Sequence, residues 1–175
     1  MKGFYQTYFE IIESIENSIR ERKIMSSLIL LYSAIDSFSH LANRTNDITR
    51  NVFINWTEKW MISYSNLPCS GIDLYAARCG ILHELISESK LSKDKKAKQI
   101  FYAWGNADIN ILKETIKNSD NEDECLALKL EEIFDAFKIG MSKCYEEISK
   151  YSSWTYSFNE KAAKYFVTIK NKTES

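Results

Sequence analysis

The sequence has few of the residues that break helices. Its 175 residues include one proline, Pro68, and five glycines. Folds built from many short strands need more turn residues, so this scarcity argues against an all-β protein and favours long helices. A chain of this length suits one domain, and it can bury enough apolar surface to fold without a metal or a disulfide. We therefore expect an all-α fold in a single domain over residues 1–175.

Paired cysteines and excess charge are lacking as well. The cysteines, which fit no CxxC or zinc-ligand spacing, are Cys69, Cys79, Cys125 and Cys144. No secretory signal is recognised, so we expect reduced thiols in a cytoplasmic protein. The formal net charge of −1 gives no overall attraction to nucleic acid. Binding of RNA would therefore need a local basic patch.

Apolar residues recur at helical spacing along most of the chain. The pattern predicts helices over about 4–20, 25–43, 48–64, 72–88 and 107–117, a long helix over about 120–150, and an amphipathic segment over about 158–169. The aromatic run 99–104 fits a strand or a helical turn. The most apolar stretch, 24–42, holds Asp36, His40 and several serines, so we expect a buried core helix and no membrane span. Together these predict a helical bundle of about five to seven helices.

The segment 72–88 combines an apolar stripe with polar side chains. The stripe comprises Leu74, Ala77, Ile81, Leu82 and Leu85. At 100° per residue Arg78 falls inside it, where a guanidinium is costly unless it is paired or faces a polar cleft. A neighbouring stripe comprises Tyr75, Cys79 and His83. Gly80 lies roughly on the opposite side, where its bare backbone would let another element approach.

Arginine and histidine together suit phosphate chemistry. Histidine can move a proton near neutral pH, and arginine offers fixed donors to a phosphate whose charge rises in the transition state. On one helix Arg78 and His83 are five residues apart, which we interpret as too far round the helix for one compact site. Two facing copies would bring the arginine of one near the histidine of the other. We therefore expect a homodimer.

The run Arg78-Cys-Gly-Ile-Leu-His83 resembles the R-x4–6-H motif of HEPN domains. Tyr75 and the upstream segment 32–38, which contains Asp36, agree with the family, and the resemblance covers about residues 25–88. It implies a helical, metal-independent endoribonuclease without a cofactor, which dimerises through the motif helices and uses Arg78 and His83 as its catalytic pair. Asp36, Tyr75 and Cys79 would be supporting residues.

The resemblance also bears on partners. Many HEPN proteins are toxins or anti-phage effectors, often encoded beside a small nucleotidyltransferase antitoxin, and we expect such a role and partner here. The residue after the arginine is often polar in the family, whereas this chain has Cys79. Some members carry a tyrosine two residues after the histidine, which the antitoxin modifies. Leu85 occupies that place, so this mode of control is not supported.

Each candidate residue also has a purely structural interpretation. Arg78 could be a buried arginine paired with Asp36 or Glu84, and His83 a surface histidine. Asp36 either orients Arg78 or His83, or belongs to a satisfied buried network with His40 and nearby serines. Trp56, Trp60 and Trp104 are expected in the core rather than as base-stacking platforms.

A run of lysines follows the motif helix. It comprises Lys90, Lys93, Lys95, Lys96 and Lys98. Such a run is either a solvated loop or, given its position, the best candidate for binding RNA phosphates.

Two other functions compete with the nuclease: a non-catalytic HEPN-like module that binds a nucleotide or a partner protein, and a structural helical subunit. A dimer with open Arg78–His83 sets would favour the nuclease, and a monomer with Arg78 buried in an ion pair would favour the others.

Overall fold

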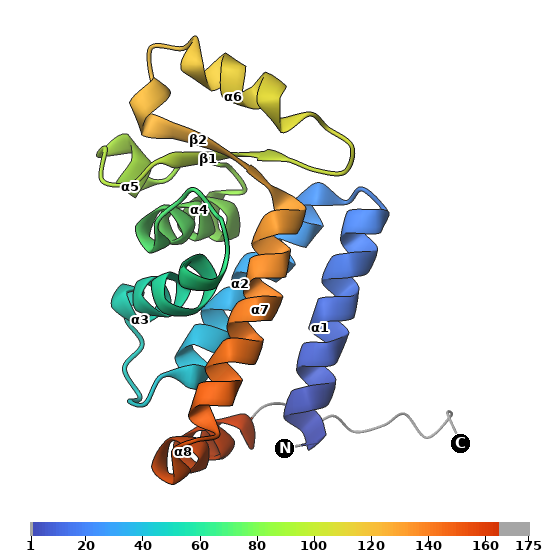
Figure 1. Cartoon of the computed structure of the whole chain (residues 1–175), viewed down its shortest axis with the longest axis vertical. Helices are drawn as coiled ribbons and strands as arrows, with labels where there is room; N and C mark the ends of the chain where they lie inside the picture. The colour runs from blue at the N-terminus through green and yellow to red at the C-terminus, as the bar shows by residue number, and fades with distance from the viewer. Residues whose placement is uncertain (1, 165–175) are drawn as a thin grey trace.

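The computed structural model describes residues 2–164, which form a helical bundle with a small sheet at one end (Figure 1). In chain order the described elements are α1 (Lys2–Arg20), α2 (Ile24–Ala42), α3 (Arg50–Trp56), α4 (Gly71–Glu84), α5 (Lys90–Lys93), β1 (Gln99–Ala103), α6 (Ile109–Lys117), β2 (Cys125–Lys129), α7 (Leu130–Ile148) and α8 (Ser152–Ala162). The predominantly helical fold expected from composition is confirmed. Eight α-helices are described rather than five to seven, because the short helix α5 adds one to the six helices and the amphipathic segment expected.

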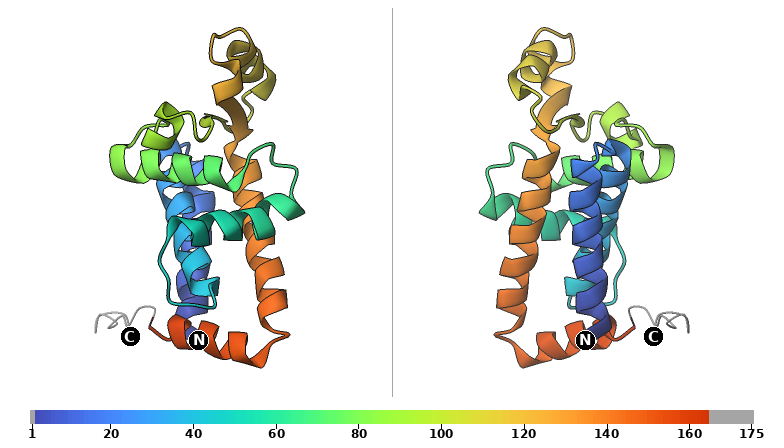
Figure 2. Two further views of the ribbon diagram at one scale, coloured as in Figure 1. Left: turned by 90° about the vertical axis from the view of Figure 1, so that its left-hand side faces the viewer. Right: turned by 90° about the vertical axis from the view of Figure 1, so that its right-hand side faces the viewer.

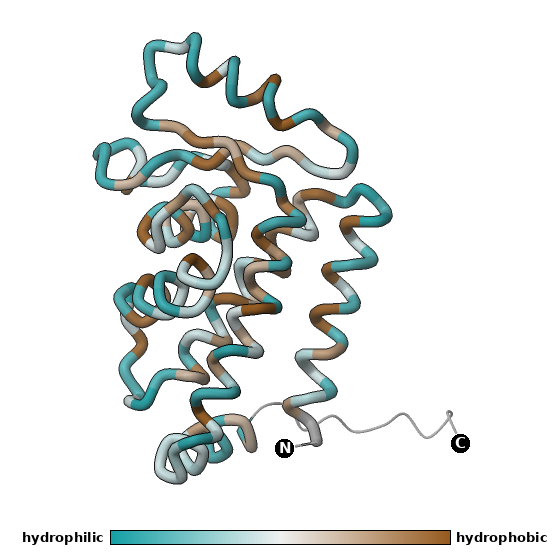
Figure 3. Tube along the Cα trace, in the orientation of Figure 1, coloured by the Kyte–Doolittle hydropathy of each residue, from teal (hydrophilic) through white to brown (hydrophobic). Residues whose placement is uncertain are grey.

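Helix α2 lies at the centre of the bundle, where α1, α3, α4, α7 and α8 all contact it. Leu31, Tyr32 and Ile35 on α2 are fully buried. By length and composition α2 could cross a membrane, but half of its apolar stretch is buried inside the bundle. The apolar character of α2 is therefore accounted for by its central position. Helix α1 is amphipathic instead, and hydrophilic and hydrophobic residues alternate along its turns (Figure 3).

The helix expected over 48–64 changes its hydrogen-bonding pattern after α3. A π-helical turn (Thr57–Met61) and a 3-10 turn (Ile62–Tyr64) continue it. The hydroxyl of Thr57 donates to the carbonyls of Phe53 and Ile54, both at 3.0 Å, and so competes with the regular ladder. The π segment packs on α7, where a Cβ at Gly140 would come within 2.9 Å of the Trp60 carbonyl oxygen. The π-helical turn therefore lies where α7 approaches this segment closely, at Gly140.

The prediction of one helix over 120–150 is wrong in its first part. Residues 122–124 form a 3-10 turn, and the next five form strand β2, which pairs in parallel with β1 from Gln99↔Cys125 to Ala103↔Lys129. The alternation of Leu126, Leu128 and Leu130 is a period-two signal that the acidic run obscured. For 99–104 the strand alternative is the correct one. Helix α6 connects the two strands and lies over the sheet at the end of the bundle (Figures 1 and 2).

The last amphipathic segment begins earlier than expected. Helix α8 starts at Ser152, and Trp154, Phe158 and Ala162 bury its inner face against the bundle. The Trp154 indole donates to the Ala42 carbonyl at 2.8 Å, which fixes α8 at the C-terminal end of α2. The remainder of the expected segment, residues 165–169, lies outside the described residues.

Candidate functional site

Helix α4 is fixed firmly at its N-terminus. Ser70 and Asp73 form a reciprocal capping box, which satisfies two backbone donors that a helix start leaves free. The Gly71 amide donates to the Glu58 carboxylate at 2.5 Å, and the Lys98 amide donates to the second oxygen of Asp73 at 2.6 Å. The start of the motif helix is therefore tied to the segment before it and to the chain that returns after it.

The other end of α4 lies four residues earlier than predicted, at Glu84. Leu85 adopts a left-handed conformation, with φ 58° and ψ 30°, and the Ile86 amide donates back to the Gly80 carbonyl at 3.3 Å. The chain then crosses Gly80, where an added Cβ would lie 2.7 Å from the carbonyl oxygens of Ile86 and Glu88. The expected close approach at Gly80 is confirmed. His83 consequently stands in the last turn of the helix, beside a tight reversal.

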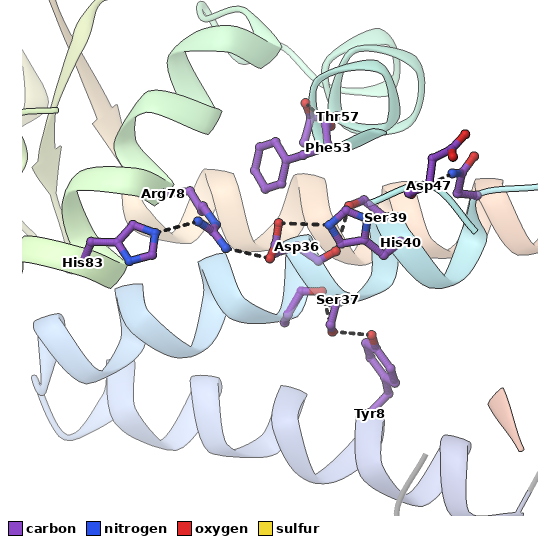
Figure 4. A network of polar contacts seen from close by, with 12 residues as sticks. Tyr8, Asp36, Ser37, Ser39, His40, Asp47, Phe53, Thr57, Arg78 and His83 are labelled. Carbon is purple, nitrogen blue, oxygen red and sulfur yellow. Dashed lines mark hydrogen bonds and ion pairs between the residues drawn. The ribbon is translucent and has the colours of Figure 1, made fainter. Parts of the chain in front are cut away.

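Arg78 and His83 contact each other within one chain. The distance from Arg78 Nη1 to His83 Nε2 is 3.0 Å (Figure 4). The interpretation that five residues separate them too far is therefore wrong. Along the helix axis the separation is about 7.5 Å, which the long arginine side chain spans. The two motif side chains form a compact pair without a second copy.

The pair is anchored to α2 by Asp36. Arg78 Nη2 lies 2.9 Å from Asp36 Oδ2, and the two side chains are 19% and 22% exposed. Burial alone would raise the pKa of the Asp36 carboxyl, but contacts with His40 and Arg78 outweigh burial and hold this pKa below its usual range. Burial would likewise lower the pKa of Arg78, yet the Asp36 carboxylate holds it above its ordinary value. The ion pair expected as one alternative for Arg78 is thus present, with Asp36 and not Glu84 as its partner.

The guanidinium is held from several sides. Nη1 faces His83 and Nη2 faces Asp36, while the buried Nε has no hydrogen-bond partner among the described residues. Cys79 interacts with both Arg78 and Tyr75, and burial together with Cys79 raises the pKa of the Tyr75 hydroxyl. The structure therefore brings the supporting residues Asp36, Tyr75 and Cys79 to the candidate pair.

His40 is a residue whose link to this site the sequence did not show. Its Nε2 lies 3.6 Å from Asp36 Oδ1, so a single carboxylate faces Arg78 with one oxygen and His40 with the other. The alternative expectation of one buried network that joins Asp36, His40 and the nearby serines does not hold for Ser37, because its hydroxyl bonds to Tyr8 on α1 at 2.6 Å. The four-residue spacing of Asp36 and His40 indicates that they share a face of α2. Only the packing of α4 on α2 shows that Arg78 contacts the same carboxylate.

The lysine-rich segment runs back along α4. Lys93 pairs with Glu88 at 3.3 Å and Lys96 with Asp94 at 3.5 Å, while Lys95 pairs with Glu124. A pocket of about 560 Å³ at the N-terminal end of α4 is lined by Lys95, Lys96 and Lys98, and equally by acidic residues. The acidic residues are Asp73, Asp123 and Glu124. The lysines are thus exposed, but several have their charge balanced locally.

The tryptophans divide between the core and the surface. Trp56 and Trp60 are buried as expected, whereas Trp104 after β1 is 41% exposed.

Within residues 2–164 no group of three histidine, cysteine or carboxylate side chains is placed to hold a metal ion. The chain matches no family model, no curated protein and no solved structure.

Proposed function

We propose that the chain is an endoribonuclease of the HEPN type that cuts RNA without a metal, by attack of the RNA's own 2′-hydroxyl. The observation that carries the proposal is the direct contact between Arg78 and the exposed His83, at 3.0 Å. A group that can transfer a proton therefore stands beside a fixed cation, and such a pair can assist phosphate cleavage by moving a proton and by stabilising developing negative charge.

The geometry supports a definite order of events. An arginine only donates hydrogen bonds, so the contact with Arg78 requires Nε2 of His83 to be unprotonated. A phosphate bound by the guanidinium would draw Arg78 away from the ring and free Nε2 to act as a base. His83 would then take the 2′-hydroxyl proton as the 2′-oxygen attacks phosphorus, and the bond to the 5′-oxygen would break. Protonation of that oxygen gives a 2′,3′-cyclic phosphate and a 5′-hydroxyl.

The same chemistry supports a homodimer. Cleavage needs one group to remove a proton and another to supply one, while each chain has two histidines, of which His83 is the exposed one. A second copy would supply the second histidine. Next to His83, Leu85 is 56% and Ile86 is 41% exposed, which gives the facing copies an apolar contact. The dimer thus rests on proton transfer and exposed apolar surface, no longer on the distance between Arg78 and His83.

The resemblance to HEPN domains extends the proposal to a biological setting. A toxin or anti-phage ribonuclease acts on RNA in the cytoplasm, and a small nucleotidyltransferase antitoxin would be its partner. All four cysteines are free thiols, in keeping with a reducing compartment. The lysines from Lys90 to Lys98 are the proposed contacts to RNA phosphates outside the cut site.

The ion pair between Arg78 and Asp36 favours a second candidate function. A guanidinium neutralised by a carboxylate at 2.9 Å has less charge to offer a transition state. A non-catalytic module that binds a nucleotide or a partner protein through the same surface would need only a partly neutralised arginine to make hydrogen bonds. The two candidates differ in whether any RNA is cut.

The test uses an RNA that carries one 2′-deoxy substitution at the mapped cut site, beside an unmodified copy, both in excess EDTA. The proposal expects cleavage of the unmodified RNA alone and products with cyclic phosphate ends. His83→Ala should lose cleavage, whereas Glu84→Gln, the exposed neighbour at the end of α4, should retain it. Cleavage at the deoxy site, or an absolute need for added metal, would overturn the proposed mechanism. Binding of RNA without cleavage would favour the non-catalytic module.

A further inference from the structure

One carboxylate, Asp36, serves two basic groups from two helices. Its Oδ2 lies 2.9 Å from Arg78 on α4, and its Oδ1 lies 3.6 Å from His40, one turn along α2. Figure 4 shows the four side chains in a row, from His83 through Arg78 and Asp36 to His40. Arginine is always charged, whereas histidine changes its charge between about pH 5 and 8. The row therefore contains a switchable charge at the end away from the candidate cleavage site.

The surroundings of His40 direct its influence toward Asp36. Nδ1 of His40 is buried without a hydrogen-bond partner among the described residues, which leaves Nε2 facing the carboxylate. From α8, the Lys161 ammonium lies on the carbonyls of His40, Asn43 and Thr45, at 3.4, 2.6 and 2.6 Å. Asp47 and Lys164 line the same pocket of about 320 Å³ as His40. Among residues 2–164, Asp36 is the one in ion-pair contact with the ring.

The charge count at the site depends on this ring. With His40 neutral, Arg78 and Asp36 cancel, and the group carries no net charge. With His40 protonated, the same three side chains carry one positive charge, because the carboxylate is shared between two cations. A phosphate that approaches Arg78 is attracted in the second state and meets a neutralised ion pair in the first.

We propose that His40 is a positioning residue that sets, through Asp36, how much of the charge of Arg78 is available to an RNA phosphate. It acts through Arg78 and does not touch the substrate. This inference rests on the proposed function and adds a regulation to it: the protein binds RNA more tightly with His40 protonated than with His40 neutral. It also explains why His40 contacts the Asp36 carboxylate, although that carboxylate is already paired with Arg78.

The chain allows a clean test, since His40 and His83 are its two histidines. In a His83→Gln background His40 is the sole imidazole, and such a protein should not cleave. Binding of a 2′-O-methyl RNA, which cannot undergo 2′-attack, is measured from pH 5.5 to 8. We expect affinity to fall roughly fivefold over this range, in line with ordinary coupling between sites. Adding His40→Gln should leave weak, pH-independent binding, and adding His40→Lys should restore tight binding at all pH values.

A second measurement needs no RNA. In the His83→Gln protein, NMR follows the His40 ring, and Arg78→Gln should move its titration to higher pH, because Asp36 is then left to His40 alone. Thermal unfolding of each variant checks that the fold persists. An unmoved His40 titration, or a pH dependence of binding that survives His40→Gln, would overturn the inference. If no variant binds RNA while the NMR coupling is present, the proposed function fails and the electrostatic link between His40 and Arg78 stands.

Discussion

Two basic regions follow each other along the chain, and they are organised in opposite ways. The guanidinium of Arg78 is mostly buried and faces fixed partners on both sides, His83 and Asp36. The lysines between Lys90 and Lys98 are exposed, and three of them form ion pairs with exposed or partly exposed acidic side chains, one of which lies in the same segment. Fixed geometry suits a reaction, in which donors must be in place before charge develops. Exposed, mobile charge suits attraction over distance, which salt weakens.

The largest effect that separates the two regions is on the rate of cleavage. Replacing Arg78 by alanine should lower the rate by about a hundredfold or more, the usual loss when one transition-state donor is removed. Arg78→Lys should recover little, because an ammonium cannot face His83 and Asp36 with two separate nitrogens. Initial rates at saturating RNA measure this effect. Neutralising Lys93 instead should leave the rate unchanged, and an equal loss there would erase the distinction drawn between the regions.

The next effect is on stability. Asp36→Asn leaves the guanidinium of Arg78 mostly buried without its counter-charge, which should cost about 1–3 kcal/mol in the free energy of unfolding. Lys95→Gln breaks an exposed pair with Glu124 and should cost much less, because solvent screens the charges of such a pair. Urea unfolding at pH 7 measures both. Equal costs would mean that the anchoring of Arg78 contributes no more than a surface pair.

The pH dependence of the same measurement has a definite sign. Contacts with His40 and Arg78 hold the pKa of Asp36 below its ordinary value of 3.8. The carboxylate therefore adds stability above the ordinary pKa, and this contribution disappears as the pH falls below it through the lowered pKa. The stability advantage of the wild type over Asp36→Asn should shrink in the same acid range. An advantage that is constant down to about pH 2 would contradict the assignment.

The sequence predicts the backbone elements better than it predicts the contacts between side chains. Helices α1, α2 and α6 lie within about two residues of the expected ranges, because long apolar periodicity is a strong signal. Strand β2 was missed because Leu126 and Leu130 also fit a helical repeat, and only the parallel pairing with β1 decides between the two. The end of α4 was placed too late because a left-handed Leu85 is unusual where glycine is preferred.

Apart from His40, the side chains that contact one another at the candidate site are named as site residues by sequence reasoning, but their geometry is not predicted. Spacing along the helix identified Arg78 and His83, while the reach of the arginine side chain, which closes a gap of five residues, is invisible to a helical projection. Asp36 is expected as a supporting residue that orients Arg78 or His83, whereas the need of a buried arginine for a counter-charge leaves Asp36 and Glu84 both open. His40 and Asp36 are one turn apart on α2, so their contact is local. The sharing of this carboxylate with Arg78 depends on the packing of α4 against α2, which periodicity does not specify.

A smaller effect concerns RNA affinity. Exchanging Lys90, Lys93, Lys95, Lys96 and Lys98 for glutamine should weaken binding of an uncleavable RNA by no more than about tenfold at low salt, because several of these charges are already balanced. The dependence of affinity on salt should become less steep, and the cut position should not change. Fluorescence anisotropy at several salt concentrations measures both quantities. Unchanged affinity at low salt would place the RNA path elsewhere.

The smallest expected effect is on the stability of the monomer when Leu85 is replaced. Leu85 follows the motif helix in a left-handed conformation that favours glycine. The left-handed φ of 58° at Leu85 costs a side chain about 1–2 kcal/mol, whereas glycine loses about 0.5–1 kcal/mol more backbone freedom on folding. Leu85→Gly should therefore stabilise the monomer by about 0.5 kcal/mol. Leu85→Ala keeps the strain and should give no such gain. If the exposed leucine side chain serves the dimer, both variants should associate more weakly in sedimentation experiments. Unchanged association in both variants, or a wild type that stays monomeric at high concentration, would remove the proposed role of Leu85 and with it the apolar contact that brings two His83 side chains together.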